Sequence, residues 1–148
     1  MGEKKIRNSF IEGPIPPEKI ADSIAAHRHK TGIGGHAIFL GQVRNDLIDG
    51  KEVQAIDFTT YREMAEQKIA EIREDIFAKH ELVCMHIYHS LGIVPAGALC
   101  FFVFTSSKHR KPAQKACEEL VERFKAEVPV WGKELFTDAS YQWKELKG

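Results

Sequence analysis

The sequence predicts a single α+β domain over residues 1–148, with about three helices and a mixed or antiparallel sheet. Segments with strand character occur in irregular order with three segments of helical periodicity, and some of the strands are joined by hairpin turns. This mixture favours α+β over a regular α/β repeat. A chain of 148 residues suits one domain with a buried core, and we find no internal repeat, low-complexity stretch or Ser/Gly linker.

The first third of the chain predicts a strand, a helix and a second strand. Residues 6–11 indicate a short first strand, after which prolines interrupt the chain. Pro17 suits the first turn of a helix that we expect over residues 18–29. Residues 31–35 are typical of a turn or flexible loop. Residues 36–43 then predict a strand.

The middle of the chain predicts a hairpin followed by a long helix. Asp49-Gly50 indicates a hairpin turn, and residues 53–60 form the expected returning strand. Apolar residues at helical spacing predict a helix over residues 61–79. Residues 82–89 indicate another strand, and residues 94–97 have the composition of a turn.

The last third contains the strongest patterns. Residues 98–105 are apolar at both alternating positions, which predicts a central strand covered on both faces. The third helix has Pro112 in its first turn and should end before Pro129. We expect closing strands at residues 130–136 and 141–146. The apolar stripe of the third helix comprises Ala113, Ala116, Cys117, Leu120, Val121 and Phe124.

Composition excludes several classes of protein. The chain has 43% hydrophobic and 28% charged residues, which is ordinary for a globular protein and argues against disorder. Lys plus Arg and Asp plus Glu each total 21, so the formal net charge is zero and the broad basic field of a nucleic-acid binder is missing. No apolar run is long enough to span a bilayer, so we expect no membrane association. The N-terminus lacks a signal-peptide pattern, and a reducing cytoplasm is the expected compartment.

A basic segment, Thr105–Pro112, joins the predicted central strand to the third helix. It holds Lys108, His109, Arg110 and Lys111 and no acidic residue. Cations are unfavourable at a helix N-terminus, by about 0.3–1 kcal/mol each when exposed. The same position is a natural anion site because free backbone N–H groups point outward there. The segment therefore indicates either a phosphate or carboxylate site or simply a solvated basic loop, and alone it does not separate the two.

Two other basic residues, Lys125 and Arg44, are informative only when they are considered together with the basic segment. Lys125 borders the apolar stripe of the third helix, where it either snorkels or has an environment suited to acid–base work. Arg44 follows a predicted strand, a position that often carries function. Taken together with the basic segment, these residues predict a site in which Arg, His and Lys side chains surround a small anionic substrate.

The spacing of the histidines and cysteines matches neither a metal-binding motif nor the motif of a catalytic thiol. The pairs His27/His29 and His86/His89 lack zinc-like spacing, and His86 and His89 would point to opposite faces of a strand. We therefore expect no metal site and no cofactor. Three cysteines without close spacing indicate neither a disulfide framework nor a zinc motif, and cysteines in apolar segments usually act as small hydrophobes. A catalytic thiol is not expected.

Several motifs together resemble a known family. In chain order they run from roughly the first long strand to Trp143, and they closely resemble the large, catalytic subunit of molybdopterin synthase. Each motif is weak alone, but their order and spacing are specific. They are Gly41-Gln42-Val43-Arg44-Asn45, Tyr61-Arg62-Glu63-Met64-Ala65, the region of His89, Gly92 and Gly97, Ser107-Lys108-His109-Arg110, and Lys125 with Pro129-Val130-Trp131-Gly132-Lys133-Glu134.

The resemblance implies an enzyme of molybdenum cofactor biosynthesis. Members of this family add two dithiolene sulfurs to cyclic pyranopterin monophosphate and so form molybdopterin. The sulfur arrives as a thiocarboxylate on the C-terminal glycine of a small ubiquitin-like subunit, whose tail enters a pocket of the large subunit. The large subunit is a homodimer within a heterotetramer, and the implied fold is of the α/β hammerhead type.

The resemblance also implies roles for individual residues. Arg44, His109 and Arg110 would hold the anionic groups of the substrate. Lys125 would be the main catalytic lysine, as a proton-transfer group or as a stabiliser of developing charge. The remaining implied pocket residues are Gln42, Val43, Gly132, Lys133 and Glu134.

One departure affects the implied site directly. The family usually has a lysine directly after the Trp of its Pro-x-Trp motif, and this chain has Gly132 there. A one-residue shift along a regular strand moves a side chain to the other face. Our hypothesis is that Lys133 replaces the missing lysine as a second catalytic cation, through a local bulge at Gly132. Ser90 and Thr59 are lesser departures.

Two other readings compete with the enzyme. In the first, the change at Gly132 has removed activity, and the chain only binds the small subunit. In the second, the basic segment belongs to an unrelated module that binds nucleotides or RNA, which predicts a steep salt dependence of binding. The zero net charge counts against this last reading.

Overall fold

The computed structural model describes residues 8–144 of the chain. Residues 6 and 7 of the first expected strand, and residues 145 and 146 of the last one, lie outside the described residues. The helices are α1 (Pro17–Ala26), α2 (Arg62–Lys79) and α3 (Arg110–Glu127). The strands are β1 (Phe10–Glu12), β2 (Gly35–Gln42), β3 (Leu47–Ile48), β4 (Lys51–Thr60), β5 (Cys84–Pro95), β6 (Leu99–Ser107), β7 (Val130–Phe136) and β8 (Tyr141–Lys144).

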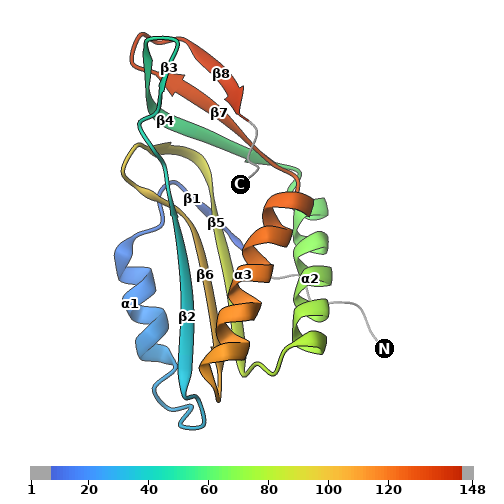
Figure 1. Cartoon of the computed structure of the whole chain (residues 1–148). Helices are drawn as coiled ribbons and strands as arrows, with labels where there is room; N and C mark the ends of the chain where they lie inside the picture. Colours follow the sequence, from blue (N-terminus) through green and yellow to red (C-terminus); the bar gives the residue numbers. More distant parts are fainter. Residues whose placement is uncertain (1–7, 145–148) are drawn as a thin grey trace.

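The strands form one eight-stranded sheet in the order β2-β6-β5-β4-β7-β8, with β3 beside β4 and β1 beside β5. Every pair is antiparallel except β1 with β5. The long strand β5 links two parts of the sheet, because its first half pairs with β6 and its last residues pair with β4. In Figure 1, β3, β4, β7 and β8 accordingly project beyond the end of the helical layer.

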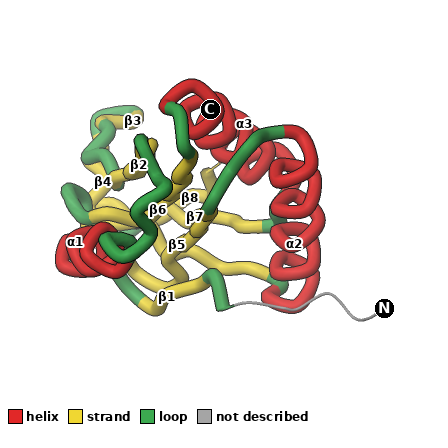
Figure 2. Tube along the Cα trace, turned by 90° about the horizontal axis from the view of Figure 1, so that it is seen from below, coloured by secondary structure: helices red, strands yellow, loops and turns green. Residues whose placement is uncertain are grey.

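Helices cover both faces of the lower part of the sheet. Helices α2 and α3 lie side by side on one face, and α1 lies on the other (Figures 1 and 2). Strand β6 shows the division, since Phe101 and Val103 pack in the core cluster under α2 and α3, whereas Phe102 and Phe104 pack on the α1 side. This double cover explains why the strand is apolar at both alternating positions.

The predicted α+β class, the three helices and the mostly antiparallel sheet are confirmed. Asp49 and Gly50 form the predicted hairpin turn, both with positive φ (51° and 78°), as a type I′ turn requires. The third helix ends before Pro129, as expected. No helix within residues 8–144 is long and apolar enough to cross a membrane.

The C-terminal ends of β5 and α1 lie away from their predicted positions. The turn expected at residues 94–97 begins later, because β5 continues to Pro95 and its last residues find hydrogen-bonding partners on β4. Gly92, with φ +82°, lies where β5 passes from one part of the sheet to the other. Helix α1 ends at Ala26, and His27, expected within the helix, is its C-cap.

Candidate functional site

A cavity of about 310 Å³ lies where β2, β4, β6, α3 and β8 meet. Its volume is at the lower end of the range for sites that bind small molecules. Apolar side chains form most of its wall, and polar or basic groups enter it from three separate segments. These groups are Gln42 and Arg44 at the end of β2, Lys125 on α3 and Lys144 on β8.

The end of β2 is bent toward this cavity. The pairing of β2 with β6 shifts register between Gly41 and Gln42, and such a bulge re-aims the side chains that follow it. A Cβ atom at Gly41 would lie only 3.0 Å from Cβ of Phe101, so glycine permits the close approach of the two strands. Backbone hydrogen bonds between Val43 and the 97–98 turn then fix the segment that carries Arg44.

Lys125 lies in the last turn of α3 and is half-buried. The C-terminal end of a helix carries partial negative charge, so a lysine is favourable there. Its neighbour Phe124 packs into the core, which holds the last turn of the helix against the cavity. The sequence places Lys125 at the border of the apolar stripe of α3, and Lys125 has this position in the structure.

Lys144 was not identified from the sequence, and it enters the cavity from β8. It pairs directly with Gly132 across the β7–β8 hairpin, and paired residues on neighbouring strands extend to the same face. Its Nζ lies 3.7 Å from a carboxylate oxygen of Glu134 and 3.9 Å from one of Asp46. Lys144 therefore occupies the face on which a lysine at position 132 would project.

Two carboxylates hold Arg44 and Lys144 in place. Glu134 is only 3% exposed, and its other oxygen accepts a hydrogen bond of 2.9 Å from Gln142 Nε2. Asp46 lies between two cations, because it accepts a hydrogen bond of 3.1 Å from Arg44 in addition to its contact with Lys144. A buried carboxylate needs such partners. Glu134 thus reaches the cavity through Lys144 and does not itself line it.

Lys133 lies outside the cavity, and the expectation that it lies beside Lys125 is corrected. The register between β4 and β7 is regular from Val130 to Leu135, so no bulge at Gly132 turns Lys133 toward Lys125. Its Nζ lies instead 4.7 Å from the ring centre of Tyr141 and 5.8 Å from that of Trp143. A regular strand places neighbouring side chains on opposite faces, and Gly132 keeps the inner face.

His109 and Arg110 are also separated from this cavity, although the sequence grouped them with Lys125. They lie at the N-terminus of α3, as its cap and first residue, and both are exposed. Lys125 is 15 residues further along the same helix, which corresponds to about 22 Å of rise. One chain therefore cannot bring these residues to one small substrate.

His89 forms part of the inner wall of the cavity, and the sequence analysis assigned it no role in binding. The imidazole stacks on Phe124 with ring centres 5.4 Å apart, and its Nδ1 donates a hydrogen bond of 2.8 Å to the Ser90 carbonyl. Burial lowers the pKa of His89 to about 4, against the opposing effect of that hydrogen bond and with a smaller contribution from the charge of Lys125. At neutral pH the cavity therefore has an uncharged imidazole beside its basic groups.

The lowered pKa of His89 predicts a specific loss of stability in acid. The unfolded chain binds this proton near pH 6.5 and the folded chain only near pH 4, so stability falls as the pH drops between these values. The full effect is about 3 kcal/mol. We expect His89→Phe to show a smaller difference in unfolding free energy between pH 7 and pH 4.5, measured by urea denaturation. His109→Gln, at an exposed histidine, is the control, and equal pH dependence in all three proteins would contradict the assignment.

The thiols near the site have the properties of buried groups. Burial raises the pKa of the Cys100 thiol, which borders the cavity, and that of the Cys117 thiol under α3. A thiol with a raised pKa is a poor nucleophile at neutral pH.

Trp131 lies on the surface next to this site. Its side chain is 41% exposed, and it packs edge-on against Tyr61 with ring centres 5.0 Å apart. Thr59, Thr60, Tyr61, Trp131 and Trp143 line a shallow hollow on the outer face of the sheet. Trp131 is exposed because it shares the outer face of β7 with Lys133.

A family model described as "MoaE protein" matches residues 11–127. The molybdopterin synthase catalytic subunit of Aspergillus niger is 34% identical over 131 residues, which cover 88% of this chain and 70% of that protein. The same subunit of Oryza sativa subsp. japonica is 36% identical over 119 residues, covering 80% of this chain and 61% of the relative. The chain thus spans less than two thirds of the rice protein.

Solved structures agree with this family match. A molybdopterin synthase structure from Staphylococcus aureus superposes with a TM-score of 0.78 at 29% identity, over 92% of this chain and 95% of that one. A complex of subunits 1 and 2 of molybdopterin-converting factor from Helicobacter pylori has a TM-score of 0.78 at 22% identity, over 93% and 89%. At that lower identity the second comparison speaks to the fold alone.

Proposed function

The chain belongs to the MoaE family of molybdopterin synthase catalytic subunits, and from this premise we propose that it transfers sulfur to cyclic pyranopterin monophosphate to form the dithiolene of molybdopterin. The sulfur donor would be the C-terminal thiocarboxylate of a small ubiquitin-like subunit. The single observation that carries this proposal is the cavity in which Arg44, Lys125 and Lys144 come together. A phosphate-bearing substrate and a thiocarboxylate are both anions, and both suit a pocket of this charge.

In the proposed mechanism Arg44 and Lys125 have different roles. Arg44 is mostly exposed at the mouth and suits the recognition of a phosphate, which a guanidinium binds through two parallel hydrogen bonds. Lys125 lies deeper and acts on the reacting atoms, either by transferring a proton or by stabilising charge as the thiocarboxylate sulfur attacks a substrate carbon and displaces an oxygen substituent. Water then cleaves the bond between this sulfur and the glycine carbonyl, which leaves the sulfur on the substrate and a plain carboxylate on the small subunit. Gln42 and the backbone near Val43 complete the wall beside it.

We propose that Lys144, in place of Lys133, is the second lysine of the site. Its support is its cross-strand position opposite Gly132 and its place in the cavity wall. Glu134 then acts as a positioning residue, because its buried carboxylate holds the ammonium of Lys144. The departure at Gly132 would therefore move the charge from one strand to its neighbour without removing it from the pocket.

A separate sulfur carrier fits the chemistry of the chain. Burial raises the pKa of the Cys100 thiol in the cavity wall, which makes it a poor nucleophile and fits a sulfur supplied by another subunit. The cavity is open to the surface and has an apolar wall, as an inserted peptide tail requires. The similar Helicobacter pylori structure is a complex of subunits 1 and 2 of molybdopterin-converting factor, which supports a partner of the same kind. We place this assembly in the cytoplasm, since the three cysteines are free thiols.

A homodimer would bring together the two groups of basic residues that are far apart within one chain. His109 and Arg110 lie at the far end of α3 from Lys125, and each is exposed and available to a neighbour. We propose that the partner copy in the dimer contributes this pair to the cavity. The substrate phosphate would then contact residues from both copies.

The dimer proposal predicts complementation between two inactive variants. Lys125→Ala and Arg110→Ala are each expected to be weak alone, whereas refolding them together restores activity. A mixed two-fold dimer has one site with both residues intact, so random mixing gives about a quarter of the wild-type sites. The measurement is single-turnover product formation by the mixture. Activity no higher than the mean of the separate variants would show that Arg110 does not act across the interface.

The proposed activity is tested by a single-turnover assay. The purified chain is mixed with a thiocarboxylated small subunit and cyclic pyranopterin monophosphate, and the dithiolene product is detected. Product formation is the expected result. Binding of the small subunit without any product would favour the alternative, a non-catalytic relative that only binds this subunit. The same small subunit with a plain carboxylate terminus is the control.

A further inference from the structure

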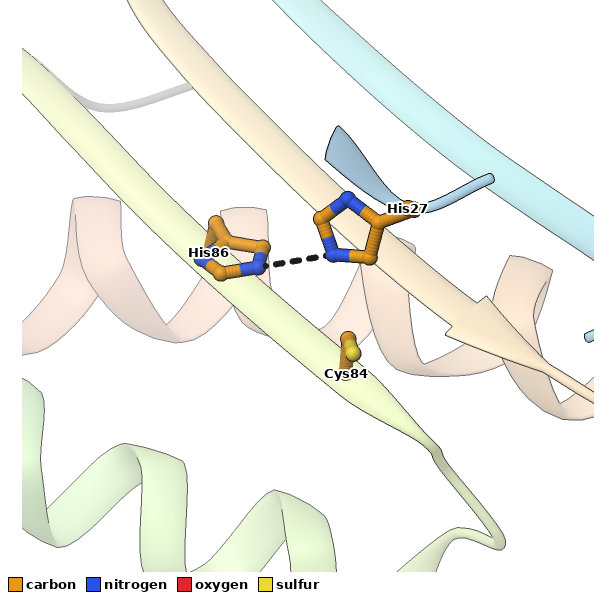
Figure 3. Close-up of side chains that lie close together, drawn as sticks. All are labelled: His27, Cys84 and His86. Carbon is orange, nitrogen blue, oxygen red and sulfur yellow. Dashed lines mark hydrogen bonds between the residues drawn. The ribbon is translucent and has the colours of Figure 1, made fainter. Parts of the chain in front are cut away.

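Three potential metal ligands meet on the face of the sheet opposite the sulfur-transfer cavity. His27 is the C-cap of α1, and Cys84 and His86 lie two residues apart on β5, so both extend toward α1. The ligand atoms of the three side chains all lie within 4.8 Å of one another. Figure 3 shows the two imidazoles facing each other, with the Cys84 sulfur beside them.

The orientation of His27 is that of a metal ligand. Its Nδ1 lies 2.6 Å from the Ser23 carbonyl oxygen, and since a carbonyl only accepts, Nδ1 carries the proton. In the neutral ring the lone pair is therefore on Nε2, which points into the cluster. Histidines that bind metals are typically oriented by such a hydrogen bond from the other ring nitrogen to a carbonyl or carboxylate. Stacking on Phe104, with ring centres 5.0 Å apart, fixes the plane of the ring.

The spacing of the two imidazoles fits a tetrahedral ion. Nε2 of His27 and Nε2 of His86 are 3.1 Å apart and share a hydrogen bond, in which His86 donates and which a bound ion would replace. Two nitrogens bound to one tetrahedral Zn²⁺ lie about 3.3 Å apart, given bond lengths near 2.05 Å. The sulfur would need about 3.6 Å to each nitrogen, and the three ligand atoms already lie within 4.8 Å of one another.

We propose that His27, Cys84 and His86 form a metal site of the zinc class, with three protein ligands and a fourth position open to water. Two imidazoles and one thiolate are the donor set that Zn²⁺ and similar borderline-soft ions prefer. His27 and Cys84 are only 8% and 6% exposed, so the ion would be largely enclosed. The ligands tie the end of α1 to β5, and bound metal therefore stabilises the fold without taking part in sulfur transfer.

Lys30 competes with the ion for the cysteine. Its Nζ donates a hydrogen bond of 2.9 Å to Cys84 Sγ, which places an ammonium where the metal has to bind. Lys30 is exposed and its long side chain can swing into solvent, so the ion displaces it. Removing this positive charge is expected to tighten binding. His36, whose ring centre is 6.2 Å from that of His27, is a further basic group beside the cluster.

Cobalt provides the direct test. Tag-free protein, stripped of metal and kept reduced with a non-thiol reductant, is titrated with Co²⁺ while its absorption is recorded. We expect one Co²⁺ per chain, with a sulfur-to-cobalt charge-transfer band and the visible bands of a tetrahedral site, both removed by Zn²⁺. Absence of a charge-transfer band in the wild type would overturn the proposal.

Matched variants assign the ligands. Cys84→Ser should lose the charge-transfer band, and His27→Gln should weaken Co²⁺ binding at least tenfold. Cys117→Ser and His29→Gln, a cysteine on the other face of the sheet and an exposed histidine in the same turn, are expected to behave as wild type. Lys30→Gln should bind Co²⁺ more tightly than the wild type does. A band that persists in Cys84→Ser would refute the site, as would a wild-type melting temperature unchanged by Zn²⁺. Circular dichroism confirms that each variant is folded.

Discussion

Replacing Lys125 with alanine is expected to lower the single-turnover rate of product formation by about 10²–10⁴-fold, the usual contribution of a group that transfers a proton in the transition state. Lys125 is the basic group that α3 brings into the cavity, beside the neutral His89. Alanine suits a helix, so the variant should remain folded. The measurement is rapid mixing with thiocarboxylated small subunit, followed by detection of the dithiolene product.

A second substitution separates the two roles proposed for Lys125. Arginine keeps the positive charge but does not release a proton at neutral pH. If Lys125 stabilises developing charge, Lys125→Arg should retain much more activity than Lys125→Ala. If Lys125 transfers a proton, the two variants should be equally slow. Wild-type rates in Lys125→Ala would remove this residue from the mechanism altogether.

Replacing Lys144 with alanine is expected to slow product formation by about 10²–10³-fold, as the loss of one electrostatic contact to a developing charge does. Lys144 lies in the cavity wall and pairs with Gly132 across the hairpin. Lys133→Ala is the matched control, because this neighbouring lysine lies over the rings of Tyr141 and Trp143 on the outer face. We expect Lys133→Ala to stay within about threefold of the wild type, as surface changes usually do.

A reciprocal change tests whether Lys144 replaces the family lysine. Gly132→Lys in the Lys144→Ala background returns an ammonium to the same face of the sheet, since the two positions are cross-strand partners. Partial recovery of the rate is the expected result. Strong loss of activity in Lys133→Ala together with a normal rate in Lys144→Ala would reverse the assignment and restore the hypothesis drawn from the sequence.

Local patterns in the sequence were sufficient for most of the fold. The helical stripe that ends before Pro129, the Asp49-Gly50 turn and the doubly apolar strand β6 were all predicted, and each depends on residues close together in the chain. The motif series also identified the family. Such features are readable because side-chain periodicity and turn geometry are properties of short segments.

Only the tertiary structure decided which groups share a site. The register of the β7–β8 hairpin places Lys144 opposite Gly132 and leaves Lys133 outside, and the length of α3 separates Arg110 from Lys125. The alternation along β5 was visible in the sequence, but its meeting with His27 was not, because α1 and β5 are far apart in the chain. Strand pairing and helix docking bring together residues with no local relation, and a regular strand moves every side chain to the other face when its register shifts by one residue.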